Sequence, residues 1–160
     1  MARILNLIFI LTIFGLWSCN PDDSTPTIPT EEKKYPVSAT VQDQIFYAND
    51  INQSIEDNIG WVMDAYDGDN VITIGTSWPL DAGNYTLSTW DPFNNQRFFA
   101  SYTSLSKEYR TLDNSGTLTI QTIRIENNTV VELIGTFEFK GYSAAGEEII
   151  IQSGRLNYQK

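Results

Sequence analysis

From Val37 to the C-terminus, turn-forming residues separate short runs of strand-forming residues. Gly, Asn and Asp recur at intervals of roughly 8 to 14 residues, and the runs between them are rich in Thr, Ile, Val, Tyr and Phe. No long segment shows the apolar period of an amphipathic helix. A chain in which turns alternate with short strand-forming runs buries its apolar side chains by pairing short strands. The sequence therefore predicts an all-β domain over residues 37–160.

The C-terminal third predicts a three-strand antiparallel meander with one buried face. Apolar residues alternate with polar ones along Thr117 to Glu126 and again along Val131 to Phe139. The parity of the apolar positions changes between Ile120 and Ile123, which predicts a β-bulge, and a second change follows at Gly154. Turns between these strands are expected at Asn127-Asn128 and Ser143–Gly146.

The earlier half of the domain repeats this pattern less regularly. Further strands are expected at Val37–Val41, Ile45–Ala48, Trp61–Tyr66, Val71–Trp78, Tyr85–Trp90 and Arg97–Leu105. A tight turn is expected at "DGDN", and Ser54–Ile59 is a candidate for a short helical turn because Ser54 and Asp57 are capping residues. A sheet of this length must fold over or close, so we expect a single antiparallel β-sandwich or flattened barrel of about eight strands.

The N-terminus has the features of an export signal. Arg3 precedes an almost wholly apolar run, Ile4 to Trp17, which is shorter than the roughly 20 residues of a membrane-spanning helix. A basic start, a short apolar body and a small residue at the end are typical of a secretory signal peptide. A buried core helix is the alternative, but it would carry a polar stripe, whereas Asn6 and Thr12 are isolated. The sequence therefore predicts a signal peptide over residues 1–18.

The segment Leu16-Trp17-Ser18-Cys19 resembles the lipobox of bacterial lipoproteins. The resemblance implies that Leu16 and Ser18 shape the processing site, and that the Cys19 thiol receives a diacylglycerol. Acylation of the new amine with a palmitate-type chain would complete a membrane anchor, because two or more chains give stable attachment. Cys19 is the only cysteine, so the alternatives are a reactive thiol or an intermolecular disulfide.

Residues 19–36 are expected to form the lipidated cysteine and a tether. Asn20 to Pro36 is rich in proline, hydroxyl residues and acids, so it cannot bury a core. Asp22-Asp23 resembles the acidic export signal that directs some lipoproteins to the outer face of the outer membrane. The alternative is that these acids only keep the tether soluble.

Three segments are similar to an uncharacterised outer-membrane lipoprotein family of Bacteroidetes, a domain of unknown function. They are Ile45–Asp50 ("IFYAND"), Gly83–Leu87 ("GNYTL") and Ser115–Tyr158. Members combine an aromatic-x-Ala start, a Gly-x-Tyr-x-Leu strand and a closing meander. The resemblance implies architecture and location, and it implies no activity.

Three aromatic residues are candidates for a ligand platform. Trp78, Trp90 and Phe93 lie next to Pro79 or Pro92 near expected loop starts, where aromatic rings can stay exposed. Exposed apolar surface often marks a binding site, and sugar rings present apolar faces to such a surface. The alternative is that these rings fill the core.

Neither a metal site nor a catalytic residue is predicted. "DAYDGDN" (Asp64–Asn70) has the oxygen density that calcium prefers, but it lacks the spacing of an EF-hand loop, and a hairpin turn alone explains it. The chain has no histidine, which removes the commonest metal ligand and general base. Twenty acids provide many carboxylate pairs for a glycan hydrolase, but no acid lies in a catalytic motif, and Asp91 is left unassigned.

The charge of the chain argues against polyanionic partners. The net charge is −10, and removal of the predicted signal peptide would leave nine bases against twenty acids. Such a surface repels nucleic acid. We therefore expect a lipoprotein that is anchored in the outer membrane through Cys19, faces the cell exterior, has no cofactor, and binds a glycan or an envelope protein without catalysis. The alternatives are a structural envelope component without a small ligand, and a glycan hydrolase or its accessory subunit.

The lipid anchor can be tested directly. Labelled palmitate should enter the wild-type chain in a lipoprotein-processing bacterium and should be absent from Cys19→Ser, because serine offers no thiol to the diacylglycerol. The measurement is the label that remains on the protein band after free lipid is extracted. Equal labelling of both chains would show that the lipobox prediction is wrong.

Overall fold

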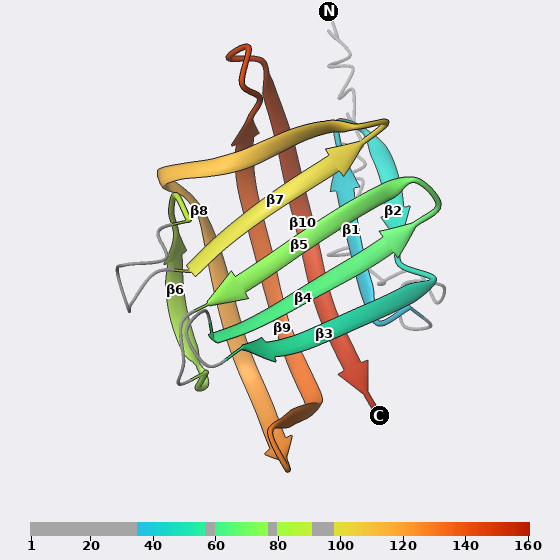
Figure 1. Cartoon of the computed structure of the whole chain (residues 1–160), viewed down its shortest axis with the longest axis vertical. Coiled ribbons are helices and arrows are strands. Elements are labelled where there is room, and N and C mark those ends of the chain that lie inside the picture. Colours follow the sequence, from blue (N-terminus) through green and yellow to red (C-terminus); the bar gives the residue numbers. More distant parts are fainter. Residues whose placement is uncertain (1–34, 57–59, 77–79, 91–97) are drawn as a thin grey trace, which may run out of the picture.

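The computed structural model describes residues 35–56, 60–76, 80–90 and 98–160, and in these ranges it consists of strands and connections without a helix (Figure 1). The strands are β1 (Val37–Val41), β2 (Gln44–Tyr47), β3 (Asp50–Glu56), β4 (Gly60–Asp67), β5 (Asn70–Thr76), β6 (Gly83–Leu87), β7 (Phe98–Ser104), β8 (Lys107–Glu126), β9 (Thr129–Tyr142) and β10 (Glu148–Gln159). The predicted all-β class is confirmed. Nothing in the described part of the chain is a helix long and apolar enough to cross a membrane.

The strands form one mixed sheet that curls into a half-barrel. Their order is β2-β1-β10-β9-β8-β6-β7-β5-β4-β3, and every pairing is antiparallel except the short parallel contact between β6 and β7. Figure 1 shows a front wall of β3, β4, β5 and β7 that crosses over a back wall of β1, β8, β9 and β10. The sequence left a sandwich and a flattened barrel open: over the described residues the sheet is a half-barrel and not a sandwich, it is mixed rather than antiparallel throughout, and it has ten strands rather than about eight.

The expected helical turn at Ser54–Ile59 is wrong over the described residues. Ser54 to Glu56 end β3, which pairs with β4 residue by residue from Asp50 to Glu56. The reason is visible at Gln53, which lies on the inner side between Ile51 and Ile55 and breaks the apolar alternation. Its Oε1 accepts a hydrogen bond from the buried indole N–H of Trp61 at 3.0 Å. A polar residue at a core-facing position thus concealed a strand from the sequence pattern.

Four hairpins close through two-residue turns. Asn127-Asn128 joins β8 and β9 as predicted, with φ values of 48° and 57°, and Gly68 in the predicted "DGDN" turn has a φ of 60°. Positive φ at these positions matches the twist of the flanking strands. The other two turns are Gln42-Asp43 and Leu105-Ser106, and all four of these residues have positive φ. These turns fix the register of the strands that they connect.

The predicted meander is formed by β8, β9 and β10. The register of β8 against β9 shifts between Ile120 and Thr122, and that of β10 against β9 shifts between Ile151 and Gly154. Both shifts coincide with the parity changes in the sequence. Gly154 is required where it stands, because a Cβ there would lie 2.5 Å from the carbonyl oxygen of Phe137.

The strand β8 belongs to both walls of the half-barrel. Its first residues pair with β7, from Ser104↔Lys107 to Ser101↔Arg110, and its later residues pair with β6 and β9. At the change of partner, the buried Thr111 hydroxyl accepts a hydrogen bond from the Ala100 N–H at 3.1 Å and donates one to the Ser88 carbonyl at 2.6 Å. The hydroxyl replaces the ladder bonds that β7 loses where β8 turns away.

The apolar core lies between the two walls. Its fully buried large side chains come from both of them and include Trp61, Met63, Ile72, Ile74, Leu87, Leu118, Leu133 and Ile151. The start of the domain is held against this body: the Tyr35 ring stacks on Tyr47 with centroids 4.7 Å apart, and the Pro36 carbonyl accepts the Asn157 N–H at 2.8 Å. The first described residues are therefore fixed beside β10.

Replacing Thr111 with valine should destabilise the domain. Valine keeps the shape of the side chain but leaves the buried Ala100 N–H and Ser88 carbonyl unpaired, so the free energy of unfolding should fall by about 2 to 4 kcal/mol. Thr111→Ser keeps the hydroxyl and should cost only about 1 kcal/mol for the lost methyl group. Urea denaturation measures both changes. Equal stability of the two variants would contradict the role given to the hydroxyl.

Candidate functional site

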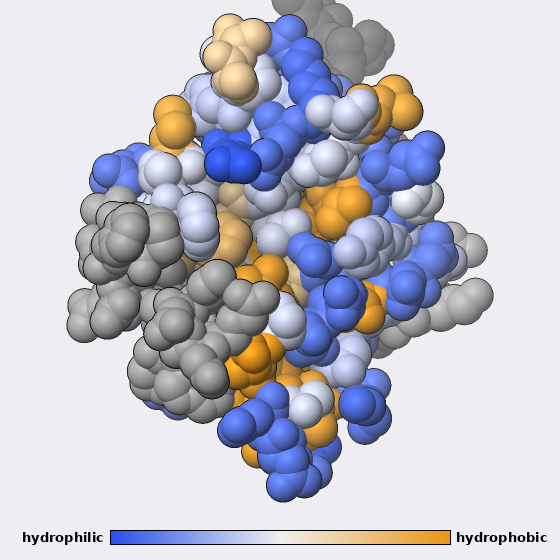
Figure 2. Space-filling view, viewed as in Figure 1, coloured by the Kyte–Doolittle hydropathy of each residue, from blue (hydrophilic) through white to orange (hydrophobic). Residues whose placement is uncertain are grey.

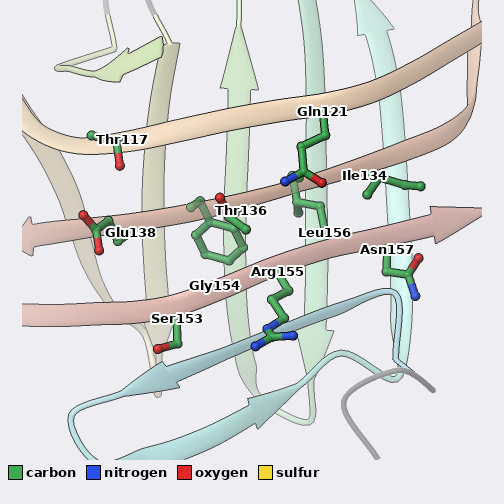
Figure 3. A pocket seen from close by; sticks show the side chains of 12 residues that line it. Thr117, Gln121, Ile134, Thr136, Glu138, Ser153, Gly154, Arg155, Leu156 and Asn157 are labelled. Carbon is green, nitrogen blue, oxygen red and sulfur yellow. The ribbon is translucent and has the colours of Figure 1, made fainter. Parts of the chain in front are cut away.

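A groove of about 670 Å³ lies on the outer face of the meander (Figure 3). Polar side chains from three adjacent strands line it: Thr117 and Gln121 from β8, Thr136 and Glu138 from β9, and Ser153, Arg155 and Asn157 from β10. Figure 3 shows Gln121 reaching from β8 over β9 toward β10. The groove is therefore built on paired strands of the sheet, which hold its side chains in place.

The bulges of the meander determine which side chains face the groove. Leu118 and Ile120 of β8 point into the core, and the extra residue Gln121 in the bulge then joins the outer face. On β10, the bulge between Ile151 and Gly154 likewise brings Ser153 to the groove. The two bulges that the sequence predicted thus lie on the two sides of the groove, one in β8 and one in β10.

The strand register arranges the polar groups in rows. Thr119, Thr136 and Arg155 lie opposite one another across β8, β9 and β10, and Thr117 lies opposite Glu138 in the next row. Neighbouring strands are about 4.8 Å apart, close to the width of a pyranose ring. A chain of sugar rings laid on this face would therefore meet a polar group at each strand.

The groove is close to electrically neutral, although the chain carries a net charge of −10. Its lining holds one acid, Glu138, and one base, Arg155. The other polar groups are hydroxyls and amides, which both donate and accept hydrogen bonds. Ile134 adds apolar surface between them. This combination suits a neutral ligand rich in hydrogen-bonding groups.

Two further hollows continue the groove along the same face. One of about 330 Å³ includes Glu138, Lys140 and Gln152, and another of about 390 Å³ includes Gln152, Gln42 and Glu148. Glu148 accepts hydrogen bonds from Lys140 at 3.3 Å and from the Tyr142 hydroxyl at 3.0 Å. The hydrogen bond to Glu148 is the main cause that raises the pKa of Tyr142. The shared residues make the three hollows one elongated path.

The expected aromatic platform is only partly described. Trp90 is 43 % exposed and meets Phe99 edge to face, with ring centroids 6.3 Å apart. Trp78 and Phe93 lie outside the described residues. Figure 2 shows the front wall, where apolar residues appear as separate orange spots among hydrophilic ones. Trp90 does not line the groove of the meander, and Trp61 is buried.

Several other sequence predictions also fall outside the described residues. They concern Cys19, Leu16, Ser18, the tether with Asp22-Asp23, and Asp91. Sequence reasoning in turn missed the groove residues Gln121, Arg155 and Asn157. The available signal was the polar face of the meander together with its parity changes, because these place polar side chains from neighbouring strands on one outer surface.

The segment Asp64–Asn70 forms the β4–β5 hairpin. Its oxygens already accept hydrogen bonds from separate partners: Asp64 from Thr73 at 2.7 Å, Asp67 from the Tyr47 N–H at 3.3 Å, and Asn70 from the Tyr102 hydroxyl at 3.1 Å. Burial, followed by the charges of Asp64 and Asp50, raises the pKa of Tyr66. Among the described residues, no three acids, histidines or cysteines come together as metal ligands.

Comparison with known proteins gives one match. The model of a family described as "Domain of unknown function (DUF6252)" matches residues 35–157. No curated protein and no solved structure matches the chain.

Calcium should leave the stability of the domain unchanged. The oxygens of Asp64, Asp67 and Asn70 already accept hydrogen bonds from three different partners, and no three acidic side chains come together among the described residues, so the turn has no preformed set of calcium ligands. The melting temperature in millimolar calcium should therefore equal that in chelator, with magnesium as the control for ionic effects. A rise of several degrees with calcium alone, lost in Asp67→Asn, would establish a calcium site in the turn instead.

Proposed function

We propose that this chain, which belongs to the DUF6252 family, is a cell-envelope lipoprotein whose β domain binds a neutral glycan without cleaving it. The proposed anchor is the acylated Cys19, and residues 19–36 are the proposed tether. Asp22-Asp23 supports a location on the outer face of the outer membrane, where glycans are accessible.

One observation carries the choice of ligand: a neutral, hydrogen-bonding groove on a strongly acidic protein. Sugar hydroxyls donate and accept hydrogen bonds, and the amides and hydroxyls of the lining offer both. Glu138 and Arg155 add charge-assisted hydrogen bonds, which are stronger than neutral ones. The elongated path toward Glu148 supports an oligomeric ligand rather than a single sugar.

The acids of the groove support binding rather than hydrolysis. Glycosidases place two carboxylates about 5 to 9.5 Å apart on either side of the bond that they cleave. Among the described residues that line the main groove, Glu138 is the one carboxylate, and the other acids of the path, Asp43 and Glu148, line its far hollow. Its neighbours across the strands carry no carboxylate: Thr117 lies opposite on β8, and the bulge residues Gln152 and Ser153 lie beside it on β10. The proposed domain therefore holds a glycan and leaves its bonds intact.

The position of the groove also suits a tethered module. Asn157 lines one end of the groove, and its N–H bonds to the Pro36 carbonyl next to the start of the domain. The path then continues toward Gln42, just after the end of β1, and Glu148, at the start of β10. A bound chain would therefore run away from the tether.

Binding is tested with the full chain in a detergent that contains no sugar groups. Neutral, acidic and basic oligosaccharides are screened on an array, and the best ligand is measured by calorimetry. Glu138→Gln and Arg155→Met should each weaken binding of a neutral oligosaccharide by about 10-fold or more, because each removes a charged hydrogen-bonding group. Incubation of the ligand with the wild-type chain should release no shorter sugars.

Glu126→Gln is the matched control, because Glu126 is exposed at the end of β8 and does not line the groove. It should bind as the wild type does. If no glycan bound, or if the Glu138 and Glu126 variants were equally affected, a structural envelope role would replace the binding proposal. Release of shorter sugars would favour the hydrolase.

A further inference from the structure

One end of the half-barrel gathers four connections. The strands β1, β4, β7 and β9 all end there, at Gln42-Asp43, Gly68-Asp69, Leu105-Ser106 and residues 143–147, and we call this the turn end (Figure 1). Side chains connect its parts. The Tyr102 hydroxyl donates to Asn70 at 3.1 Å, Gln42 Nε2 donates to the Glu148 carbonyl at 3.4 Å, and Lys107 forms an ion pair with Glu147. The connections are therefore held in one fixed arrangement.

Leu105 at the turn end has no evident structural reason for its position. Its side chain is 79 % exposed, and its φ of 48° is a conformation that bulky side chains adopt rarely. The equivalent turn at Asn127-Asn128 uses asparagines, which tolerate this conformation. A leucine at this position is unfavourable for two reasons: its backbone conformation is rare for a bulky side chain, and its apolar side chain is exposed to water. Strained residues of this kind often serve a contact outside the fold.

A pocket of about 400 Å³ lies beside Leu105. Its apolar and aromatic lining comes from Val41, Tyr102, Tyr109 and Ile149, while Gln42, Gln44, Ser104 and Lys107 add polar groups. The Tyr102 and Tyr109 ring centroids are 6.4 Å apart, and the Lys107 ammonium lies 5.6 Å from the Tyr109 centroid. An apolar side chain that entered this pocket would contact the tyrosines and cover Leu105.

The charge around the pocket is negative. Each base near it already pairs with a glutamate among the described residues: Lys107 with Glu147, Arg110 with Glu108, and Lys140 with Glu148. Asp43, Asp67 and Asp69 belong to the adjoining turns, and within the described part of the chain no basic side chain pairs with them. The turn end thus surrounds an apolar pocket with uncompensated acids.

From this arrangement we propose that the turn end binds a basic segment of a partner protein, with an apolar side chain between lysines or arginines. The apolar side chain enters the pocket beside Leu105, and the flanking cations face the aspartates of the turns. Complementary charge speeds encounter and selects the partner, while the buried apolar contact supplies most of the affinity. The residues of this pocket differ from those of the main glycan groove, although Gln42 also lines the far hollow of the elongated path. Leu105 lines this pocket and none of the three hollows, so its variant distinguishes the two proposals.

The probe is an array of short peptides in which one leucine stands between lysines, with a glutamate series and a leucine-to-serine series beside it. Binding to the full chain in detergent is measured by fluorescence anisotropy. The lysine-leucine peptides should bind, both other series should bind at least tenfold more weakly, and binding should weaken as salt rises. Absence of binding, or equal binding of the glutamate series, overturns the proposal.

Leu105→Asn is the decisive variant. Asparagine suits positive φ, so the melting temperature should stay the same or rise, while peptide affinity falls about tenfold or more from the lost apolar contact. Leu112→Asn is the matched control, because Leu112 is also exposed but does not line the pocket. It should bind as the wild type does. Equal loss in both variants overturns the assignment to the turn end.

Asp43→Asn with Asp69→Asn tests the charge separately. This double variant should weaken binding severalfold and flatten its dependence on salt. Sedimentation of the chain alone gives the remaining outcome: a dimer that Leu105→Asn abolishes would replace the basic partner with a second copy of this chain.

Discussion

The change of partner along β8 determines the shape of this molecule. On one side, this strand of 20 residues pairs first with β7 of the front wall and then with β6, while on its other side it pairs with β9 of the back wall from Arg110 onward. A buried ladder cannot be interrupted without new partners for its N–H and carbonyl groups. The Thr111 hydroxyl provides them for Ala100 and Ser88. This side chain satisfies polar groups at the bend, where the pairings of β8 with β7 and β9 keep the half-barrel one continuous sheet.

Sequence patterns correctly predicted those parts of the fold that depend on residues close together in the chain. Apolar parity located the meander and two of its four register shifts, and the asparagine pair located the β8–β9 turn. The strand β3 was missed because Gln53 faces the core, where it binds the indole of Trp61, a residue eight positions away. The choice between sandwich and curled sheet depends on where β8 changes neighbours. That contact joins residues far apart in the sequence, so no local pattern contains it.

The candidate groove shows a similar limit. The polar face of β9 is evident in the sequence, but the groove needs Gln121 and Arg155 from two other strands, and only the register brings them together. The neutrality of the groove could not be inferred from the net charge of −10, because a net charge does not show where on the surface the charged residues lie. The aromatic prediction rested on residues next to prolines, and of these three the structure describes Trp90, on a surface apart from the groove.

The contacts that hold the start of the domain against the sheet have a mechanical consequence. Pro36 bonds to Asn157, Tyr35 stacks on Tyr47, and Val37 lies opposite Leu156 on β10, the strand that forms one side of the groove. If the tether anchors the chain as proposed, tension between the membrane and a polymer bound on the meander passes through the pairing of β1 with β10. These two strands are antiparallel neighbours, so the force runs along their length and shears several ladder hydrogen bonds together. The front wall and its turns would carry almost none of that load.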